Sequence, residues 1–273
     1  MYYLRLLVFS TVFRSTLWVL SLLAFEIVFA NNSRTLSDAN IDKSPDVQGF
    51  CFDIIAGKSN IGSILQLKTF NDGIHGILNF TQNKNNVFIQ KSESDQFFTP
   101  LKSTYENYLN QKLVDSKITT FESVKNKILI QTSNFKFKKP VKSEHPLGLV
   151  LSAQMTDLLF SKKDITEIKP EEKIIFQTYS ESLGKTQQIN SSLETESDYL
   201  VLNHSSEGET FSTKHSTNGD LLGSHLKTKN IFIKACTSSS VLTHINSALD
   251  NKKFKSLFSF DDRKKLKTCC QHF

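Results

Sequence analysis

The chain has 273 residues, of which 38% are hydrophobic and 22% charged, and its formal net charge is +6. Its basic residues are lysines apart from Arg5, Arg14, Arg34 and Arg263, and the lysines are scattered or form short runs such as 135–139. Because the chain has neither arginine clusters nor an aromatic RNA-binding signature, this composition fits a folded domain and argues against a nucleic-acid partner.

Residues 1–30 have the pattern of a secretory signal peptide. Arg5 and Arg14 precede an apolar run over 17–25, and the segment ends at Ala30. The run is shorter than the roughly 20 residues that cross a bilayer, and Glu26 would be costly at membrane depth. The alternative is a signal anchor that stays in the membrane. No later segment is apolar enough to span, so the remainder is expected to be soluble.

A short motif follows the leader within the polar stretch 31–48, which contains Pro45 and is expected to be an exposed processing segment. The motif is Arg34-Thr35-Leu36-Ser37-Asp38. It resembles the host-targeting PEXEL-type element of exported malaria-parasite (Plasmodium) proteins, whose pattern is Arg-x-Leu-x-Glu/Gln/Asp. The resemblance implies an export protease that cuts after Leu36, a vacuolar translocon, and delivery to the host erythrocyte. In that interpretation Arg34 and Leu36 are recognised by the protease, and Asp38 supports export.

Residues 49–273 are expected to form a single domain that begins with short strands. The first four are expected at 51–55, 63–70, 76–81 and 87–90, and Asn71-Asp72-Gly73 supplies a tight turn. In the second strand Leu65 and Leu67 lie on one face, and Gln66 and Lys68 lie on the other. These four strands predict an antiparallel meander.

The rest of the domain mixes further strands with helices. Helices are expected at 102–114, 147–162 and 241–258, where apolar residues recur at helical spacing. Further strands are expected at 117–122, 127–132, 173–179, 199–202, 209–213 and 230–235. The predicted fold class is α+β: an antiparallel, β-sheet-rich single domain with two or three amphipathic helices.

The four cysteines are Cys51, Cys236, Cys269 and Cys270, an even number that permits two disulfides in a secreted chain. Because adjacent cysteines rarely bond to each other, Cys269 and Cys270 are expected to reach Cys51 and Cys236 in some order. Two alternatives stay open: a zinc site near His272, which the lack of paired Cys-x-x-Cys spacing disfavours, and free thiols in a reducing compartment.

The search for catalytic chemistry gives no candidate site. The seven histidines form no metal-binding pair on a helix, and the chain has no Gly-rich phosphate loop and no Gly-x-Ser-x-Gly. Cys236 with His244 as its base is disfavoured against a disulfide or core cysteine, since nothing in the sequence orients the pair. No enzyme activity, metal or cofactor is therefore expected. Weak Asn-x-Ser/Thr glycosylation sequons, in a number expected by chance, lie at Asn31, Asn79, Asn190 and Asn203.

Two classes of function are compatible with these observations. The first is a non-catalytic exported protein that binds a host or parasite protein while the infected cell is remodelled. The second is a secreted β-rich carrier of a lipid or small ligand, in the parasite vacuole or a periplasm-like compartment. A lined apolar cavity would favour the carrier, and a solid core with a broad exposed patch would favour the interaction protein.

Overall fold

The computed structural model describes residues 46–136, 139–162, 172–195, 199–216 and 221–256, and its strands form one 15-stranded sheet. The strands of the first half are β1 (Asp46–Ala56), β2 (Ser59–Asn71), β3 (Ile74–Asn83), β4 (Asn86–Asp95), β5 (Pro100–Leu109), β6 (Lys112–Val124), β7 (Lys127–Asn134) and β8 (Val141–Pro146). Those of the second half are β9 (Leu149–Leu151), β10 (Lys173–Ser180), β11 (Lys185–Thr195), β12 (Tyr199–Ser206), β13 (Glu209–Ser216), β14 (Leu221–Leu226) and β15 (Ile231–Ala235).

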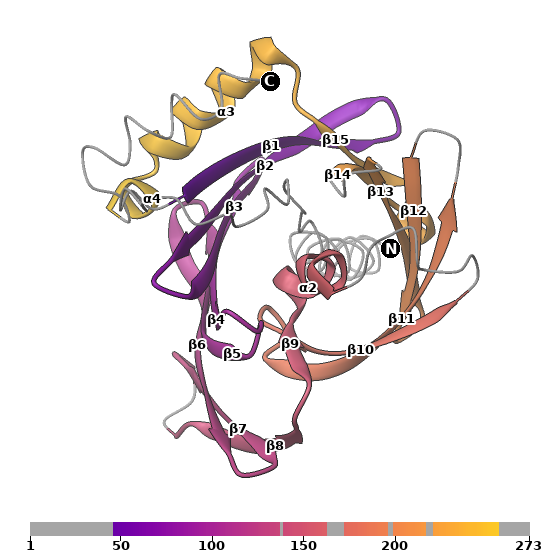
Figure 1. Cartoon of the computed structure of the whole chain (residues 1–273). Coiled ribbons are helices and arrows are strands. Elements are labelled where there is room, and N and C mark those ends of the chain that lie inside the picture. The colour runs from indigo at the N-terminus through magenta and orange to yellow at the C-terminus, as the bar shows by residue number, and fades with distance from the viewer. Residues whose placement is uncertain (1–45, 137–138, 163–171, 196–198, 217–220, 257–273) are drawn as a thin grey trace, which may run out of the picture.

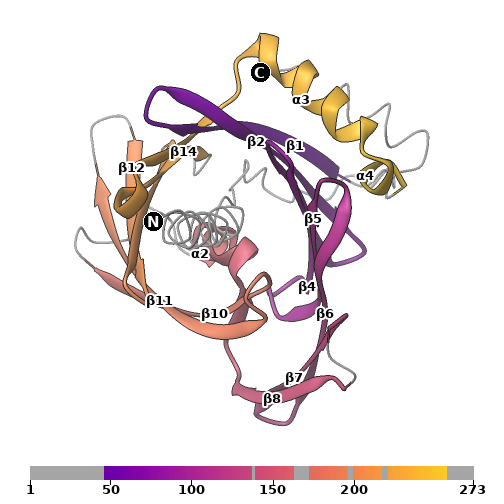
Figure 2. The ribbon, with the colours of Figure 1, turned by 180° about the vertical axis from the view of Figure 1, so that it is seen from behind.

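Sheet order follows chain order in two runs that meet at β1 and β15. The order is β8-β7-β6-β5-β4-β3-β2-β1-β15-β14-β13-β12-β11-β10-β9, and the pairs are antiparallel except that β9 and β10 are parallel. The sheet curls into a nearly closed barrel, and helix α2 (Met155–Lys162) lies inside the ring of strands in both views (Figures 1 and 2).

Tight turns join many of the antiparallel neighbours. Asp72 and Gly73 have φ of 50° and 77°, and Glu207 and Gly208 have φ of 46° and 86°. Two successive residues with positive φ match the twist of the flanking strands, which is why glycine is favoured there. The turn expected at residues 71–73 is therefore confirmed as the link between β2 and β3.

The predicted α+β fold class is wrong, because the described chain is almost entirely strand. The helix expected at 102–114 is the β5–β6 hairpin, which turns at Asn110 and Gln111 with φ of 50° and 65°. Its apolar residues lie on two faces: Tyr105 points inward, whereas Tyr108 packs with the cluster outside the sheet. The helical spacing was a coincidence of strand alternation interrupted by a turn.

The other two expected helices are shorter than predicted. Residues 147–162 form β9, a 3₁₀ turn η1 (Ser152–Gln154) and α2. Residues 241–258 overlap α3 (Ser238–Asp250) and α4 (Lys252–Ser256). Another short 3₁₀ turn, η3 (Lys227–Lys229), precedes β15. The sequence analysis placed β5 and β9 in helices and predicted no strand at β8, β11 or β14.

Both faces of the first strands are covered. Helix α3 packs on the outside of the barrel, where Val241, Ile245 and Ala248 join Leu65 and Leu67 in a buried cluster. Helix α2 fills part of the inside, where it joins the large cluster formed by the inner face of the second half of the sheet. Leu65 and Leu67 thus point outward beneath a helix, and Gln66 between them points inward.

Side chains join the two ends of the curled sheet. The cluster of Phe121, Ile128 and Ile130 packs β6 and β7 against Leu149, Leu151 and Tyr179 of β9 and β10. The Tyr179 hydroxyl also lies 2.8 Å from both Thr119 Oγ1 and Thr132 Oγ1. In the described residues the seam is therefore held by packing and side-chain hydrogen bonds.

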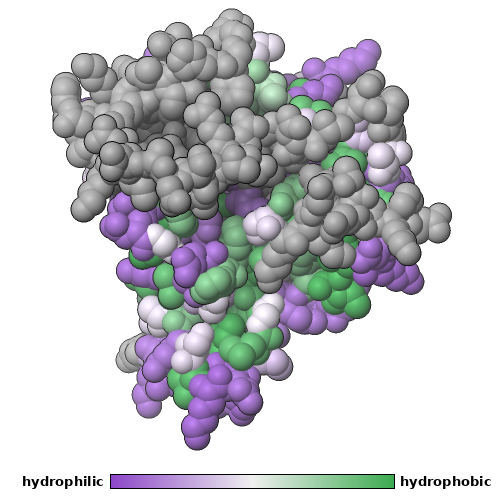
Figure 3. Space-filling model, viewed as in Figure 1, coloured by the Kyte–Doolittle hydropathy of each residue, from purple (hydrophilic) through white to green (hydrophobic). Residues whose placement is uncertain are grey.

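The β7–β8 hairpin extends beyond the ring of strands and carries exposed apolar side chains. Val141 on the edge strand β8 is 60% exposed. Phe135, which precedes that strand in the sequence, is 53% exposed, and Leu147, which follows it, is 51% exposed. Hydrophobic and hydrophilic side chains alternate over this end of the molecule (Figure 3). None of the helices in the described parts of the chain is both long enough and apolar enough to serve as a membrane span.

Candidate functional site

The inner face of β2–β6 is lined by buried polar side chains, which is unusual for the interior of a sheet. The pairing register places Gln66, Asn79, Gln90 and Tyr105 in one row across four strands. Each of these four side chains is at most 5% exposed. Successive residues of a strand alternate between faces, so inward residues recur at every second position.

Two more rows flank the first. Ser92, Ser103 and Thr119 are paired across β4, β5 and β6 and are all buried. On the other side, Thr81 and Asn107 both oppose Phe88 across β3, β4 and β5. The polar inner face is defined here as these residues of the three rows: Gln66, Asn79, Thr81, Gln90, Ser92, Ser103, Asn107 and Thr119.

Several acceptors of this face have no donor. Within the described part of the chain, Thr81 Oγ1, Gln90 Oε1 and Asn107 Oδ1 are buried and have no hydrogen-bond partner. A buried polar group left unpaired costs about 1–3 kcal/mol, so proteins carry few of them without a reason. Three on adjacent strands point to a group that would supply N–H or O–H donors.

The charges beside the polar inner face are paired. Lys117 Nζ lies 2.6 Å from Asp115 Oδ2 and donates to the Ser182 carbonyl at 2.7 Å. Lys68 Nζ lies 2.6 Å from Asp157 Oδ1 on α2. Burial raises the pKa of Asp157 to about 6, against the opposing effect of Lys68. The face therefore presents dipoles more than net charge.

Glu181 is buried at the end of β10, where it contacts the edge of this face. Its two carboxyl oxygens accept hydrogen bonds of 2.8 Å from Ser92 Oγ and Ser152 Oγ. Burial raises the pKa of Glu181 to about 7, although the serine hydroxyls favour the charged form. This enclosed carboxyl group links β4, η1 and β10 through its hydrogen bonds, whether it is protonated or charged.

In the second half of the barrel interior, a hydrogen-bonded group of polar side chains lies within an apolar core. Ser191 Oγ lies 2.7 Å from His204 Nδ1, and Thr213 Oγ1 lies 3.0 Å from His204 Nε2 and 2.9 Å from His215 Nε2. Burial lowers the pKa of His204 to about 3, so this ring is neutral near pH 7. Both ring nitrogens of His204 are satisfied by hydroxyl groups, which is the arrangement of a structural histidine.

The expected export residues Arg34, Leu36 and Asp38 lie outside the described residues. So do the sequon at Asn31 and the two disulfide candidates Cys269 and Cys270.

The predicted cysteine pairing is wrong, because Cys51 and Cys236 are bonded to each other across a sequence separation of 185. The adjacent strands β1 and β15 bring the two together, and this contact between distant parts of the chain leaves no trace in the local sequence. His244, disfavoured as a base for Cys236, does lie beside it, but the Cys236 thiol is bonded.

The sequons differ in accessibility. Asn79 is 1% exposed and accepts a hydrogen bond from Gln66 Nε2 at 2.9 Å, so it cannot carry a glycan in this fold. Asn203 is half-buried and accepts from Lys227 Nζ at 3.0 Å. Asn190 is exposed on β11.

The sequence analysis missed the polar inner face because it did not establish which face of each strand lies inside the barrel. Leu65 and Leu67 were expected on one face of the strand and Gln66 and Lys68 on the other, and neither face was assigned to the interior. A signal was present in the regular recurrence of Gln, Asn, Ser and Thr at every second position of the first strands, but only the sheet register shows that these positions share a face.

Comparison with known proteins adds a fold likeness. No protein-family model matches the chain, and no curated protein matches it. One solved structure that is similar is the β-barrel-like protein of a domain of unknown function, DUF1849, from Brucella abortus. The TM-score is 0.51 at 10% sequence identity, and the match covers 71% of this chain and 96% of that one. At this identity the likeness shows the fold alone: the chain has a β-barrel-like architecture.

Proposed function

We propose that the chain is a non-catalytic binding barrel that takes a small, neutral ligand rich in hydroxyl or amide N–H groups on the polar inner face. The observation that carries the proposal is the set of buried acceptors without donors: Thr81 Oγ1, Gln90 Oε1 and Asn107 Oδ1. A neutral ligand is favoured because the neighbouring charges of Lys117 and Lys68 are already paired with carboxylates.

The proposed ligand is polar, which distinguishes this barrel from a lipid carrier. The apolar part of the interior is packed by the chain's own residues, since Met155 and Leu159 of α2 join the cluster of β11–β15. The part with unsatisfied groups is polar, and polar groups in a site specify orientation and ligand class. Sugars, polyols and amides have the matching chemistry.

The test is a thermal-shift screen of the full chain against a panel of neutral sugars, polyols and amides. A compound that raises the melting temperature of the wild type should fail to do so for Gln90→Leu and Asn107→Leu. Gln188→Leu is the matched control, because Gln188 is exposed on the outer side of β11. Equal shifts in Gln90→Leu and Gln188→Leu would contradict the proposal.

We further propose that the chain travels the secretory route and is exported through the Arg34–Asp38 motif. The position of the motif behind a signal-like leader supports this, and a disulfide between Cys51 and Cys236 is typical of oxidising compartments. A tagged Arg34→Ala copy should remain uncut and be retained, whereas Thr35→Ala should be cut after Leu36 as the wild type is. Identical processing of both copies would exclude the export hypothesis.

A second candidate function, binding of a host or parasite protein, is favoured by one observation. Strand β8 is an edge of the sheet, and Val141 on it is 60% exposed. An exposed edge strand offers unpaired backbone groups to another chain. Val141→Pro should then abolish complex formation without changing the thermal shift caused by a small ligand.

A further inference from the structure

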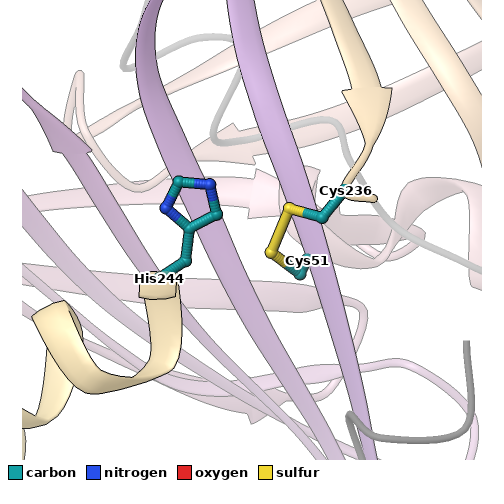
Figure 4. A group of neighbouring side chains, drawn as sticks. All are labelled: Cys51, Cys236 and His244. Carbon is teal, nitrogen blue, oxygen red and sulfur yellow. A yellow bond between two sulfur atoms is a disulfide. The ribbon is translucent and has the colours of Figure 1, made fainter. Parts of the chain in front are cut away.

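Three side chains that could bind a metal meet on the outside of the barrel. Cys51 lies on β1, Cys236 directly follows β15, and His244 lies on α3 (Figure 4). The two sulfurs and a ring nitrogen of His244 all lie within 4.8 Å of one another. Cys51 is 185 residues from Cys236, and His244 follows Cys236 on the next helix, so no local Cys-x-x-Cys spacing marks the site.

Packing fixes the position of the histidine. Helix α3 is held on the sheet by Val241, Ile245 and Ala248, which are all buried, and His244 lies on the same stretch of helix. The site is therefore formed by a sheet and a helix that are already in place.

A carboxylate orients the imidazole ring. Asp53 is two residues beyond Cys51 and so shares its face of β1, and its Oδ1 lies 2.8 Å from His244 Nε2. Asp53 Oδ1 also accepts a hydrogen bond from Asn60 Nδ2 at 2.8 Å. A histidine that ligates a metal is commonly paired with a carboxylate, and that pairing fixes the ring and raises its basicity.

We propose that reduction of the Cys51–Cys236 disulfide converts this corner into a zinc site, in which both thiolates and the His244 imidazole bind Zn²⁺. A dithiol reductant gives two electrons and two protons to the S–S bond, which becomes two thiols, while the reductant is oxidised to its own disulfide. Zn²⁺ then forms two Zn–S bonds and releases the two thiol protons. A water molecule completes the fourth position, because the Asp53 carboxylate is already paired with His244.

The donor set favours zinc over the oxygen-binding ions calcium and magnesium. Two thiolates and an imidazole are the ligands of tetrahedral zinc sites, whereas Ca²⁺ and Mg²⁺ require oxygen ligands. The site keeps β1, β15 and α3 joined under reducing conditions, and the disulfide joins β1 to the end of β15 under oxidising ones. The chain would thus retain a cross-link at this corner in either environment.

The experiment uses the full chain with Cys269→Ser and Cys270→Ser, so that these thiols cannot contribute. The protein is reduced anaerobically with a phosphine and titrated with Co²⁺, followed by Zn²⁺. One equivalent of Co²⁺ should give thiolate-to-cobalt charge-transfer absorption and the strong visible bands of tetrahedral cobalt, and Zn²⁺ should abolish both. The oxidised protein should show neither band.

Matched variants separate a specific site from loose thiol binding. His244→Ala should weaken zinc binding by at least about tenfold, and Asp53→Asn by about tenfold, as expected for losing a ligand and its orienting partner. His145→Ala, on β8, should bind as the wild type does. Oxidised His244→Ala should still form the disulfide, which shows that the variant folds.

Three results would overturn the proposal. In the first, the reduced protein shows no thiolate-to-cobalt charge-transfer absorption when Co²⁺ is added. In the second, His244→Ala binds Co²⁺ as tightly as the wild type does. In the third, the reduced protein unfolds before any metal is added.

Discussion

Ser92 Oγ on β4 donates a hydrogen bond of 2.8 Å to Glu181 Oε1 at the end of β10, so the two halves of the sheet meet at a buried carboxyl group. Ser152 Oγ of η1 donates to the other oxygen at the same distance. Because water is excluded, the pKa of Glu181 rises from 4.5 to about 7.

The stability of the fold should therefore depend on pH through Glu181. Its pKa is higher in the folded than in the unfolded chain, so the folded state binds more protons between these values. The stabilisation that comes from the raised pKa is fully present below about pH 4. As the pH rises through 7 this stabilisation is lost, which lowers the free energy of unfolding by about 3 kcal/mol. Urea unfolding of the wild type and Glu181→Gln across this range measures the difference.

Other groups titrate in the same range, so the informative quantity is the wild type minus the variant. Glu181→Gln keeps an oxygen acceptor and stays neutral. Its free energy of unfolding should therefore increase relative to that of the wild type as the pH rises. A difference in unfolding free energy that does not vary with pH would contradict the raised pKa of Glu181.

Thr81→Val should stabilise the protein when no ligand is present. The Thr81 hydroxyl is buried without a partner in the described residues, and valine has nearly the same shape and suits a strand. We expect a gain of about 1 kcal/mol in the free energy of unfolding, measured by chemical denaturation.

Thr213→Val is the control for that substitution. It removes a hydroxyl that lies 3.0 Å from His204 Nε2, and it should destabilise the fold by about 1–3 kcal/mol, because a buried ring nitrogen loses its partner. If both variants are destabilised equally, the Thr81 hydroxyl has a structural partner and the binding proposal loses part of its basis.

Tyr179→Phe should loosen the seam of the barrel. The hydroxyl bridges Thr119 and Thr132 at 2.8 Å each, and its loss should cost about 1 kcal/mol. Hydrogen exchange should become faster in β9 and β10. Tyr108→Phe, on the outer face beside Glu106, should leave exchange in these strands unchanged.

Peptide mapping under non-reducing conditions should recover Cys51 linked to Cys236. Cys269→Ser with Cys270→Ser should leave that linkage in place, because neither residue is part of it. Recovery of Cys51 linked to Cys269 or Cys270 would contradict the pairing in this fold.

Local pattern was sufficient for many strands and for some turns. Asn71-Asp72-Gly73 predicted the β2–β3 turn because glycine readily adopts positive φ, and the strands predicted at 117–122 and 127–132 are the two strands of the β6–β7 hairpin. The β5–β6 turn was not predicted because Asn110 and Gln111 adopt positive φ although neither is a glycine.

The site could not be predicted from one strand at a time. Gln66 and Leu65 are both buried, since β2 is covered by side chains on one face and by α3 on the other, so periodicity cannot tell which face is inside. The register of the sheet is needed to recognise the row from Gln66 to Tyr105. In the same way, the β1–β15 pairing is needed to recognise that Cys51 lies beside Cys236.

The central place of β1 in the sheet has a mechanical consequence. Although it is the first strand described along the chain, β1 has β2 on one side and β15 on the other, and Cys51 fastens it to the end of β15. A pore that pulled on the N-terminal end would meet this doubly paired strand first, and the covalent link would have to be reduced before the hairpins behind it could be drawn out one after another. The resistance to threading would therefore be concentrated at the entry end, and the redox state of a single bond would set how fast the chain yields.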